Sequence, residues 1–289
     1  VEIMSAAIEL KGVSKSYPHF ALKDITFNVP KGCIVGLIGE NGAGKSTTLK
    51  TILNICSADA GTITFYGKGI NTLSLSDKEN IGVVFDDSVF YENLSAFELE
   101  KIFSKIYKKW DRNYYLELLT KLDIPTDKKL AEYSKGMKTK LSVICALSHH
   151  PKVLIIDESL SSLDPVMRDE MLDLLLDFVT DDENAVLFSS HIIEDLQKIA
   201  DYIVFINHGE VAFEKSKDEL LYENAIIRCR ANQLSEIEKQ DMIAIYRDEN
   251  GVAVLVHNYD GIRGKYKNLM VDQATLDEIM KIMIKGELV

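Results

Sequence analysis

The sequence predicts an α/β fold with one large domain and a small accessory domain at the C-terminal end. Three observations predict it. An apolar run at 33–38 leads into a glycine-rich turn and a helical pattern. Two more β-rich runs, 153–156 and 185–188, are separated by a helical pattern at 166–178, as expected of parallel strands buried on both faces. A helical texture from 95 to 149 indicates an insertion in this α/β core.

The composition of the 289 residues is that of a globular protein. Apolar residues make up 46% and charged residues 27%, which excludes a disordered or fibrous chain. The formal net charge of −12 has the wrong sign for a protein that holds a nucleic acid duplex by its phosphates. We therefore expect no nucleic-acid partner.

The cysteines and apolar runs indicate a location in the cytoplasm. The four cysteines are far apart and do not have metal-ligand spacing, so we expect reduced packing residues: Cys33, Cys56, Cys145 and Cys229. The apolar runs are far shorter than the ~20 residues that cross a bilayer. The first residues do not show a basic segment followed by an apolar one, so we expect no secretory signal.

The chain is predicted to open with a β subdomain. Residues 8–13 and 21–29 alternate apolar with polar side chains, which indicates antiparallel strands at an edge of the fold. The buried strand at 33–38 follows, and a helix is expected to begin near Lys45. A strand, a glycine-rich loop and a helix in this order form the geometry of a phosphate site.

A helical subdomain is predicted over about 87–150. Its first helix follows the capping-box pattern Ser95-Ala96-Phe97-Glu98. Pro125 interrupts the helical pattern and Pro151 stops it. We expect helices at 95–107, 114–122 and 135–149.

The pattern changes again beyond about Glu219, so we place the domains at 1–218 and 219–289. The second segment is predicted to be a small α/β domain. In it we expect strands at 225–230 and 252–257 and helices at 234–239 and 273–285.

A phosphate-binding motif fills the loop after the strand at 33–38. Gly39-Glu40-Asn41-Gly42-Ala43-Gly44-Lys45-Ser46 fits G-x-x-x-x-G-K-[ST] at every fixed position. The glycines let successive N–H groups face a phosphate, Lys45 neutralises phosphate oxygens, and the Ser46 hydroxyl is a ligand for Mg²⁺. The alternative, a glycine-rich turn without a ligand, fits the motif and its context less well. The residues expected to contact the nucleotide are Gly39, Asn41, Gly42, Ala43, Gly44, Lys45, Ser46 and Thr47.

Two carboxylates end the buried strand at 153–156. Asp157 and Glu158 lie at the carboxyl edge, where ligands bind in open α/β sheets. We expect Asp157 to hold Mg²⁺ and Glu158 to orient or deprotonate the attacking water. A strand that ends in Asp-Glu is common, and it is the phosphate loop upstream that favours this interpretation. Together the two motifs indicate a P-loop NTPase.

Tyr133-Ser134-Lys135-Gly136-Met137 precedes the helix that ends just before Pro151. This segment resembles the signature of ATP-binding cassette (ABC) proteins. Ser134 at a helix start and Gly136 beside it make a second anion site, suited to a γ-phosphate. The resemblance covers about 8–218 and implies a P-loop NTPase core of the RecA-like type that hydrolyses ATP with Mg²⁺.

The resemblance assigns roles to further residues. Tyr17 looks like the aromatic residue that stacks on adenine, although it is also compatible with an ordinary loop tyrosine. Ser161-Ser162-Leu163-Asp164 resembles the loop that contacts the opposite subunit, and Asp164 is equally suited to cap the next helix. His191 matches the switch histidine that bonds the γ-phosphate.

The sequence departs from the family pattern at two places. Asp86 stands where the family has a glutamine; an aspartate can still ligate Mg²⁺ or orient water, but it adds negative charge near the γ-phosphate. Asp86 is therefore a candidate for a catalytic and metal-binding role, and we expect slow or gated turnover. Lys135 and Met137 stand where Gly and Gln are usual, and we expect activity to survive this change.

The resemblance implies that two cassettes, in a homodimer or with a paralogous cassette, sandwich ATP between the phosphate loop of one and the signature of the other. ATP-driven closure would power a separate membrane permease, docked beside the Asp86 loop on the cytoplasmic face of the membrane. The signature and the length resemble ATPases of bacterial ABC-2 type exporters of drugs, peptides or envelope substrates. The alternatives are a slow regulatory cassette, suggested by Asp86, and a soluble non-transport ABC ATPase, disfavoured by the net charge.

Overall fold

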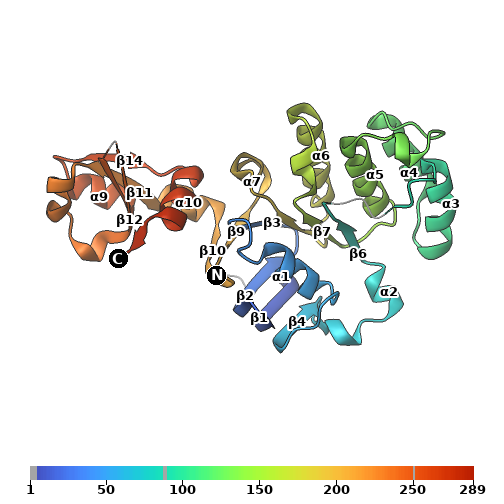
Figure 1. The fold of residues 1–289 in the computed structure, drawn as a ribbon, viewed down its shortest axis with the longest axis horizontal. Coiled ribbons are helices and arrows are strands. Elements are labelled where there is room, and N and C mark those ends of the chain that lie inside the picture. The colour runs from blue at the N-terminus through green and yellow to red at the C-terminus, as the bar shows by residue number, and fades with distance from the viewer. Residues whose placement is uncertain (1–4, 87–89, 250) are drawn as a thin grey trace. The chain divides into compact units, whose positions relative to one another are not determined.

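The computed structural model describes residues 5–86, 90–249 and 251–289, which form two compact units (Figure 1). The first unit runs to Glu214 and the second begins at Lys215, whereas the sequence places the boundary after residue 218. The division falls inside strand β10 (Glu210–Ser216). Because the chain passes from one unit to the next as a strand, no break in composition marks the boundary.

An antiparallel sheet opens the first unit, in the order β2-β1-β4-β5. Ile8 of β1 pairs with Val29 of β2 on one side and with Phe65 of β4 on the other. The strands at 8–13 and 21–29 are confirmed and are longer than predicted. The bounds are β1 Ala6–Tyr17, β2 Phe20–Pro30, β4 Ala60–Phe65 and β5 Lys68–Gly69.

A six-stranded sheet forms the core of the first unit, in the order β10-β9-β3-β8-β7-β6. The ladders joining β9, β3, β8, β7 and β6 are parallel. Every residue of β3, β7 and β8 is buried, which explains their continuous apolar sequences and confirms the predicted parallel core. The bounds are β3 Ile34–Ile38, β6 Ile81–Val84, β7 Val153–Asp157, β8 Ala185–Ser189 and β9 Tyr202–Asn207.

Helices cover both faces of the six-stranded sheet. Leu49 of α1 (Lys45–Ile52) belongs to a core shared by strands of the two sheets. On the other face α7 (Ile193–Ile199) approaches closely, since a Cβ at Gly36 would lie 2.7 Å from Leu196 Cδ2. Helix α6 (Pro165–Phe178) lies near α7 (Figure 1). This packing fixes the sheet edge on which the site is built.

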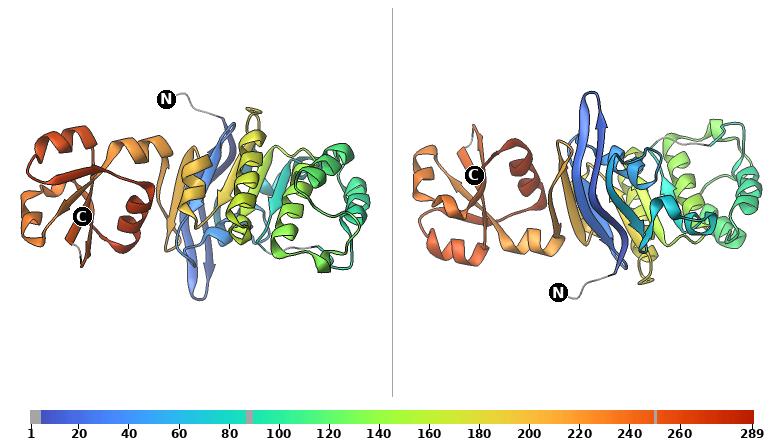
Figure 2. Two further views of the ribbon diagram at one scale, coloured as in Figure 1. Left: turned by 90° about the horizontal axis from the view of Figure 1, so that it is seen from above. Right: turned by 90° about the horizontal axis from the view of Figure 1, so that it is seen from below.

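The helical insertion contains α3 (Ala96–Ile106), α4 (Arg112–Lys121) and α5 (Lys135–Leu147), which group together (Figure 2), whereas the short helix α2 (Leu75–Lys78) precedes β6. The predicted capping box is present, because Glu98 Oε2 accepts from Ser95 N at 2.8 Å and Ser95 Oγ accepts from Glu98 N at 3.3 Å. The predicted subdomain begins at 87, and residues 87–89 lie outside the described residues. Helix α5 ends at Leu147 rather than 149, and His150 adopts φ 49° before Pro151.

The second unit is an antiparallel sheet in the order β14-β11-β13-β12-β15 with three helices. The predicted helix at 234–239 is wrong, because short 3₁₀ segments, 231–236 and 239–241, occupy this stretch, which lacks a sustained apolar helical face. The predicted helix at 273–285 begins only at Leu276, since Gln273 belongs to β14 and Thr275 caps the helix. The bounds are α8 Lys217–Glu223, β11 Asn224–Cys229, β12 Met242–Asp248, β13 Gly251–His257, α9 Tyr259–Lys265, β14 Met270–Gln273, α10 Leu276–Lys285 and β15 Glu287–Leu288.

Within the described ranges, we find no helix with both the length and the apolarity needed to cross a bilayer.

Candidate nucleotide site

A cavity of about 520 Å³ lies at the loop between β3 and α1. Gly44 precedes the helix with φ +118°, and a Cβ there would lie 2.7 Å from Leu22 Cδ2. A side chain at this position would therefore both strain the backbone and clash. The lining residues are His19, Phe20, Asn41, Gly42, Gly44, Lys45, Ser46, Thr47 and Glu158.

The remaining predicted loop residues shape the turn from behind. The Ala43 N–H donates to Glu40 O at 3.0 Å, and the Ala43 carbonyl accepts from Gly209 N at 2.9 Å. A Cβ at Gly39 would lie 2.3 Å from Ile206 O in β9. Gly39 and Ala43 thus hold the loop against the sheet, while Asn41, Gly42 and the residues from Gly44 to Thr47 face the cavity.

Lys45 is the central cation of the cavity. Its side chain is 4% exposed, and its ammonium donates to Gly39 O at 2.8 Å and to Glu40 O at 3.1 Å. The same nitrogen lies 3.0 Å from Glu158 Oε1. The three donors of the ammonium are thereby used, so a phosphate that binds here must take over at least one of these contacts.

The ends of β7 and β8 bring three oxygen-bearing side chains together. Asp157 and Ser189 are paired residues of the two strands. Asp157 Oδ1 accepts from Ser46 Oγ at 3.1 Å and from Ser189 Oγ at 2.9 Å. Sequence reasoning missed Ser189; the signal was a small polar residue ending the strand beside the Asp-Glu strand.

Glu158 lies one residue beyond β7 with φ 49°. Strain of this kind costs about 1 kcal/mol or more and is concentrated at functional sites. Its N–H donates to Ser189 O at 3.2 Å, and its Oε2 lies 3.5 Å from His191 Nδ1. The structure therefore brings together Lys45, Glu158 and His191, three of the residues that the sequence singles out.

Tyr17 ends β1, outside the residues that line the cavity. Its ring lies under the Lys15 ammonium at 5.8 Å, and hydrogen bonding with the Cys56 thiol raises the pKa of its phenol. Asp59 accepts from Ser16 N at 2.7 Å and so fixes the backbone next to it. The aromatic residue of this turn that lines the cavity is Phe20, which sequence reasoning missed.

The predicted signature forms the start of α5. Ser134 is the N-cap, and its Oγ accepts from Met137 N at 3.2 Å. A Cβ at Gly136 would lie 3.3 Å from Leu163 Cδ2, so the signature packs against the predicted inter-subunit loop. Asp164 in that loop caps α6 by accepting from Met167 N at 3.0 Å.

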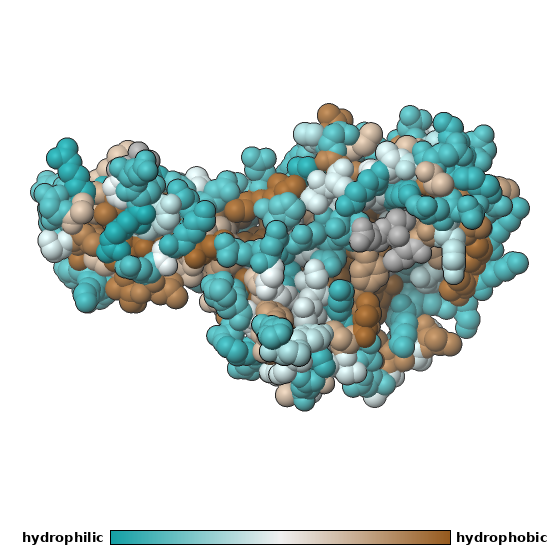
Figure 3. Space-filling view, viewed as in Figure 1, coloured by the Kyte–Doolittle hydropathy of each residue, from teal (hydrophilic) through white to brown (hydrophobic). Residues whose placement is uncertain are grey.

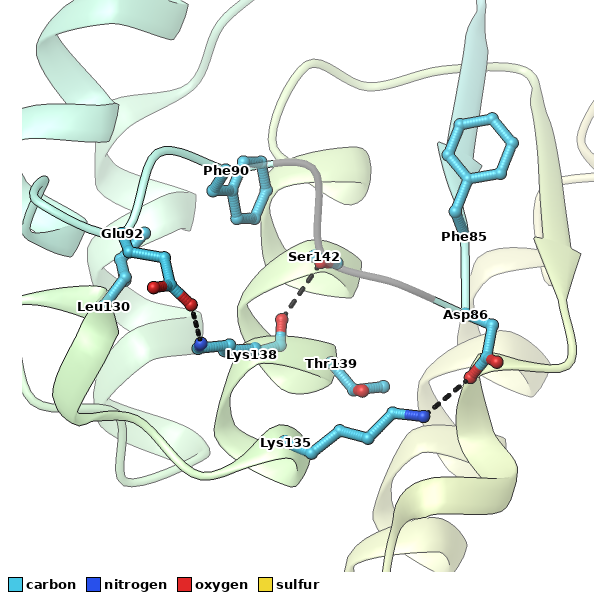
Figure 4. Close-up of a pocket in the computed structure, with 9 residues that line it drawn as sticks. All are labelled: Phe85, Asp86, Phe90, Glu92, Leu130, Lys135, Lys138, Thr139 and Ser142. Atoms are coloured by element: carbon cyan, nitrogen blue, oxygen red, sulfur yellow. Dashed lines mark hydrogen bonds and ion pairs between the residues drawn. The ribbon is translucent and has the colours of Figure 1, made fainter.

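Asp86 lies in a different cavity, of about 380 Å³ (Figure 4). Its Oδ1 lies 3.1 Å from Lys135 Nζ, and it is outside the residues that line the loop cavity. Its predicted roles in catalysis and metal binding stay predictions.

The donors at the sheet edge suit Mg²⁺. Ser46 Oγ and Asp157 Oδ1 are hard oxygen ligands already 3.1 Å apart, and Mg²⁺ is held in proteins by one or two carboxylates together with phosphates and water. Clusters of three or more His, Cys, Asp or Glu side chains with metal-binding geometry are absent from the described residues.

Comparison with known proteins adds to this geometry. A family model described as ABC transporter matches residues 22–161. The chain is 35% identical over 217 residues to the ABC transporter ATP-binding protein YtrB of Bacillus subtilis (strain 168), covering 75% of this chain and 74% of YtrB. It is 32% identical over 228 residues to the lantibiotic transport ATP-binding protein SrtF of Streptococcus pyogenes, covering 76% and 97%. The bacitracin transport ATP-binding protein BcrA of Bacillus licheniformis is 29% identical over 294 residues, covering 98% and 95%.

Solved structures agree. An ATP binding subunit of an ABC transporter is 28% identical, with a TM-score of 0.67 over 74% of this chain and 91% of that chain. The ATP-binding cassette MJ0796, a dimer in a post-hydrolysis state bound to ADP and Pi, is 23% identical with a TM-score of 0.65, over 72% and 98%. The second likeness shows the fold alone. The predicted P-loop NTPase fold is confirmed.

Proposed function

The chain belongs to the ABC transporter family of ATP-binding ATPases, and from this premise we propose that it powers export through a separate membrane permease. The observation that carries the proposal is the meeting of Lys45, Glu158 and His191 beside the Ser46–Asp157 pair at one sheet edge. The lantibiotic and bacitracin transport proteins among its relatives favour a drug, peptide or envelope substrate.

The phosphates of ATP would bind in the loop cavity. The N-terminus of α1 and Lys45 supply positive charge there. Ser46 and Asp157 would hold Mg²⁺, which neutralises phosphate charge when bound. The proposed Mg²⁺ site does not include Asp86, whose carboxylate is paired with Lys135 outside the lining of the loop cavity.

Hydrolysis would depend on a change of partner at Glu158. With Lys45 3.0 Å and His191 3.5 Å away, the carboxylate is held by two neighbours. Phosphate oxygens that attract Lys45 would free Glu158 to orient and deprotonate water, and His191 would then contact the γ-phosphate. Binding of ATP would thus prepare the base for its reaction.

A second chain would complete the site. Ser134 and Gly136 lie at the start of α5 beside the Ser161–Asp164 loop, where they would contact the γ-phosphate held by a second cassette. Bound ATP would then stabilise the dimer of two cassettes, and hydrolysis would let the dimer dissociate.

The permease would dock on the helical insertion from the cytoplasmic face of the membrane. An apolar cavity of about 230 Å³ shares Phe85 and Phe90 with the Asp86 cavity and is also lined by Phe103 and Tyr107 among others. Apolar side chains also gather over α3 (Figure 3), where Phe97, Ile102 and Ile106 are exposed. An amphipathic permease segment with an apolar face fits this surface.

The proposal is tested by the ATPase activity of the purified chain with Mg²⁺, beside Glu158→Gln, with the mass followed with and without ATP. We expect turnover in the unmodified chain, loss of turnover in the variant, and an ATP-dependent dimer of the variant. Turnover that survives in Glu158→Gln, or the absence of nucleotide binding in both proteins, would overturn it.

A further inference from the structure

Two ion pairs cross the cavity around Asp86 (Figure 4). The carboxylate of Asp86 lies 3.1 Å from Lys135 Nζ, and that of Glu92 lies 2.7 Å from Lys138 Nζ. Both lysines belong to α5. The helix that starts with the signature is therefore tied electrostatically to two segments of its own chain.

The Asp86–Lys135 pair joins the two parts of the molecule that are proposed to contact phosphates. Asp86 comes two residues after β6, whose Val84 is paired with Ile156 of β7, next to Asp157. Lys135 lies between Ser134 and Gly136, the two signature residues. The pair thus links the nucleotide-binding sheet edge to the signature, whereas Glu92–Lys138 does not reach the sheet.

The strength of this link follows from its exposure. The side chains of Lys135 and Asp86 are 57% and 49% exposed. Solvent and salt screen such a pair, so it biases the position of the signature rather than fixing it. Lys135 also balances the negative charge that Asp86 would otherwise bring toward a triphosphate.

We propose that Asp86 is a positioning residue, which orients the signature through its ion pair with Lys135 and so favours ATP-driven dimerisation. The negative charge of Asp86 is then the property that matters, in contrast to the neutral glutamine expected at this position. The inference rests on the proposed function, since it concerns the signature in the dimer.

Substituting Asp86 by glutamate or by glutamine separates the effect of its charge from that of its size, because the two side chains are almost equally large and only glutamate is charged. In the full chain carrying Glu158→Gln, dimerisation is measured by mass against ATP concentration. Asp86→Gln should require about twofold to fivefold more ATP for half-maximal dimerisation than Asp86→Glu, the range that an exposed ion pair is worth. ATP binding by the monomer and the Mg²⁺ concentration for half-maximal dimerisation should be equal in the two variants.

A double-mutant cycle tests the pairing itself. Lys135→Gln should shift dimerisation as Asp86→Gln does, and the double variant should shift it no further, because each substitution removes the same interaction. The pair Asp169–Lys198 is the matched control, at 2.8 Å with side chains 59% and 47% exposed. Asp169→Asn and Lys198→Gln should leave dimerisation unchanged.

Three results would overturn the inference: additive effects of the two substitutions, an Asp86→Gln variant that dimerises as well as Asp86→Glu, or an altered Mg²⁺ dependence in Asp86→Gln alone, which would make Asp86 a metal ligand. If the Glu158→Gln parent does not dimerise with ATP, the proposed function fails first. Failure of the inference alone leaves that parent dimer intact.

Discussion

The phosphate loop and the signature are both proposed to contact a phosphate, yet their surroundings differ. Lys45 in the loop is buried with its donors used by Gly39, Glu40 and Glu158. Ser134 and Lys135 in the signature are exposed. The loop has its catalytic neighbours within the same chain, whereas the signature presents a helix start outward. Under the proposed function, each chain therefore supplies a phosphate-loop half-site around Lys45 and a signature half-site that acts on the nucleotide of a second cassette.

The largest expected effect comes from removing Lys45 from the phosphate loop. Lys45→Ala should weaken ATP binding and turnover by about 100-fold to 1000-fold, because it removes the central donor to the phosphates. Titration of the purified variant with ATP measures this loss. Lys50→Ala, an exposed lysine of the same helix, is the control and should bind ATP normally; equal losses in both would contradict the role of Lys45.

The second expected effect concerns the far end of the signature helix. His149 is stacked on Tyr107 with centroids 4.2 Å apart, and burial lowers its pKa to about 4. Below about pH 6.5 His149 is protonated in the unfolded chain but stays neutral in the folded chain. The contribution of neutral His149 to stability is therefore complete above about pH 6.5 and is lost as the pH falls from 6.5 to 4. The loss is on the order of 3 kcal/mol.

Denaturant unfolding between pH 7.5 and 4.5 measures this dependence in three proteins. His149→Phe should reduce the pH dependence of the free energy of unfolding. His150→Gln, at the exposed neighbouring histidine, should leave that dependence unchanged. An unchanged pH slope in His149→Phe would show that other groups cause the loss.

A smaller effect is expected from substituting Ser134 in the exposed signature. Ser134→Ala removes the N-cap of α5 and should lower the free energy of unfolding by about 1 kcal/mol. It should also weaken ATP-driven dimerisation while leaving ATP binding by the monomer unchanged. Ser95→Ala removes the equivalent cap of α3 and should affect stability alone. Similar dimerisation in the two variants would argue against a role of Ser134 across the interface.

Much of the fold and the loop cavity could be predicted because their causes are local. The strand at 34–38, the glycines and Lys45 are contiguous, and a fixed motif specifies them. The helix predicted at 234–239 is wrong because only Leu234 and Ile237 of this short stretch pack on the core, and two apolar contacts are met by 3₁₀ turns without a sustained helix.

The contacts that the sequence did not predict join residues far apart in the chain. Ser189 meets Asp157 because β8 pairs with β7, and Asp86 meets Lys135 across 49 positions. Phe20, which follows the turn after β1, lines the cavity, whereas Tyr17 at the end of β1 does not. Spacing in the sequence carries no direct signal of such pairings.

A mixing experiment tests most directly whether the site is shared between two chains. Lys45→Ala disables the loop and Ser134→Arg disables the signature, so each variant alone should be inactive. In a one-to-one mixture, the intact loop of one chain meets the intact signature of the other, and the account predicts that Mg²⁺-dependent ATPase activity reappears. A mixture as inactive as its components would contradict the shared site.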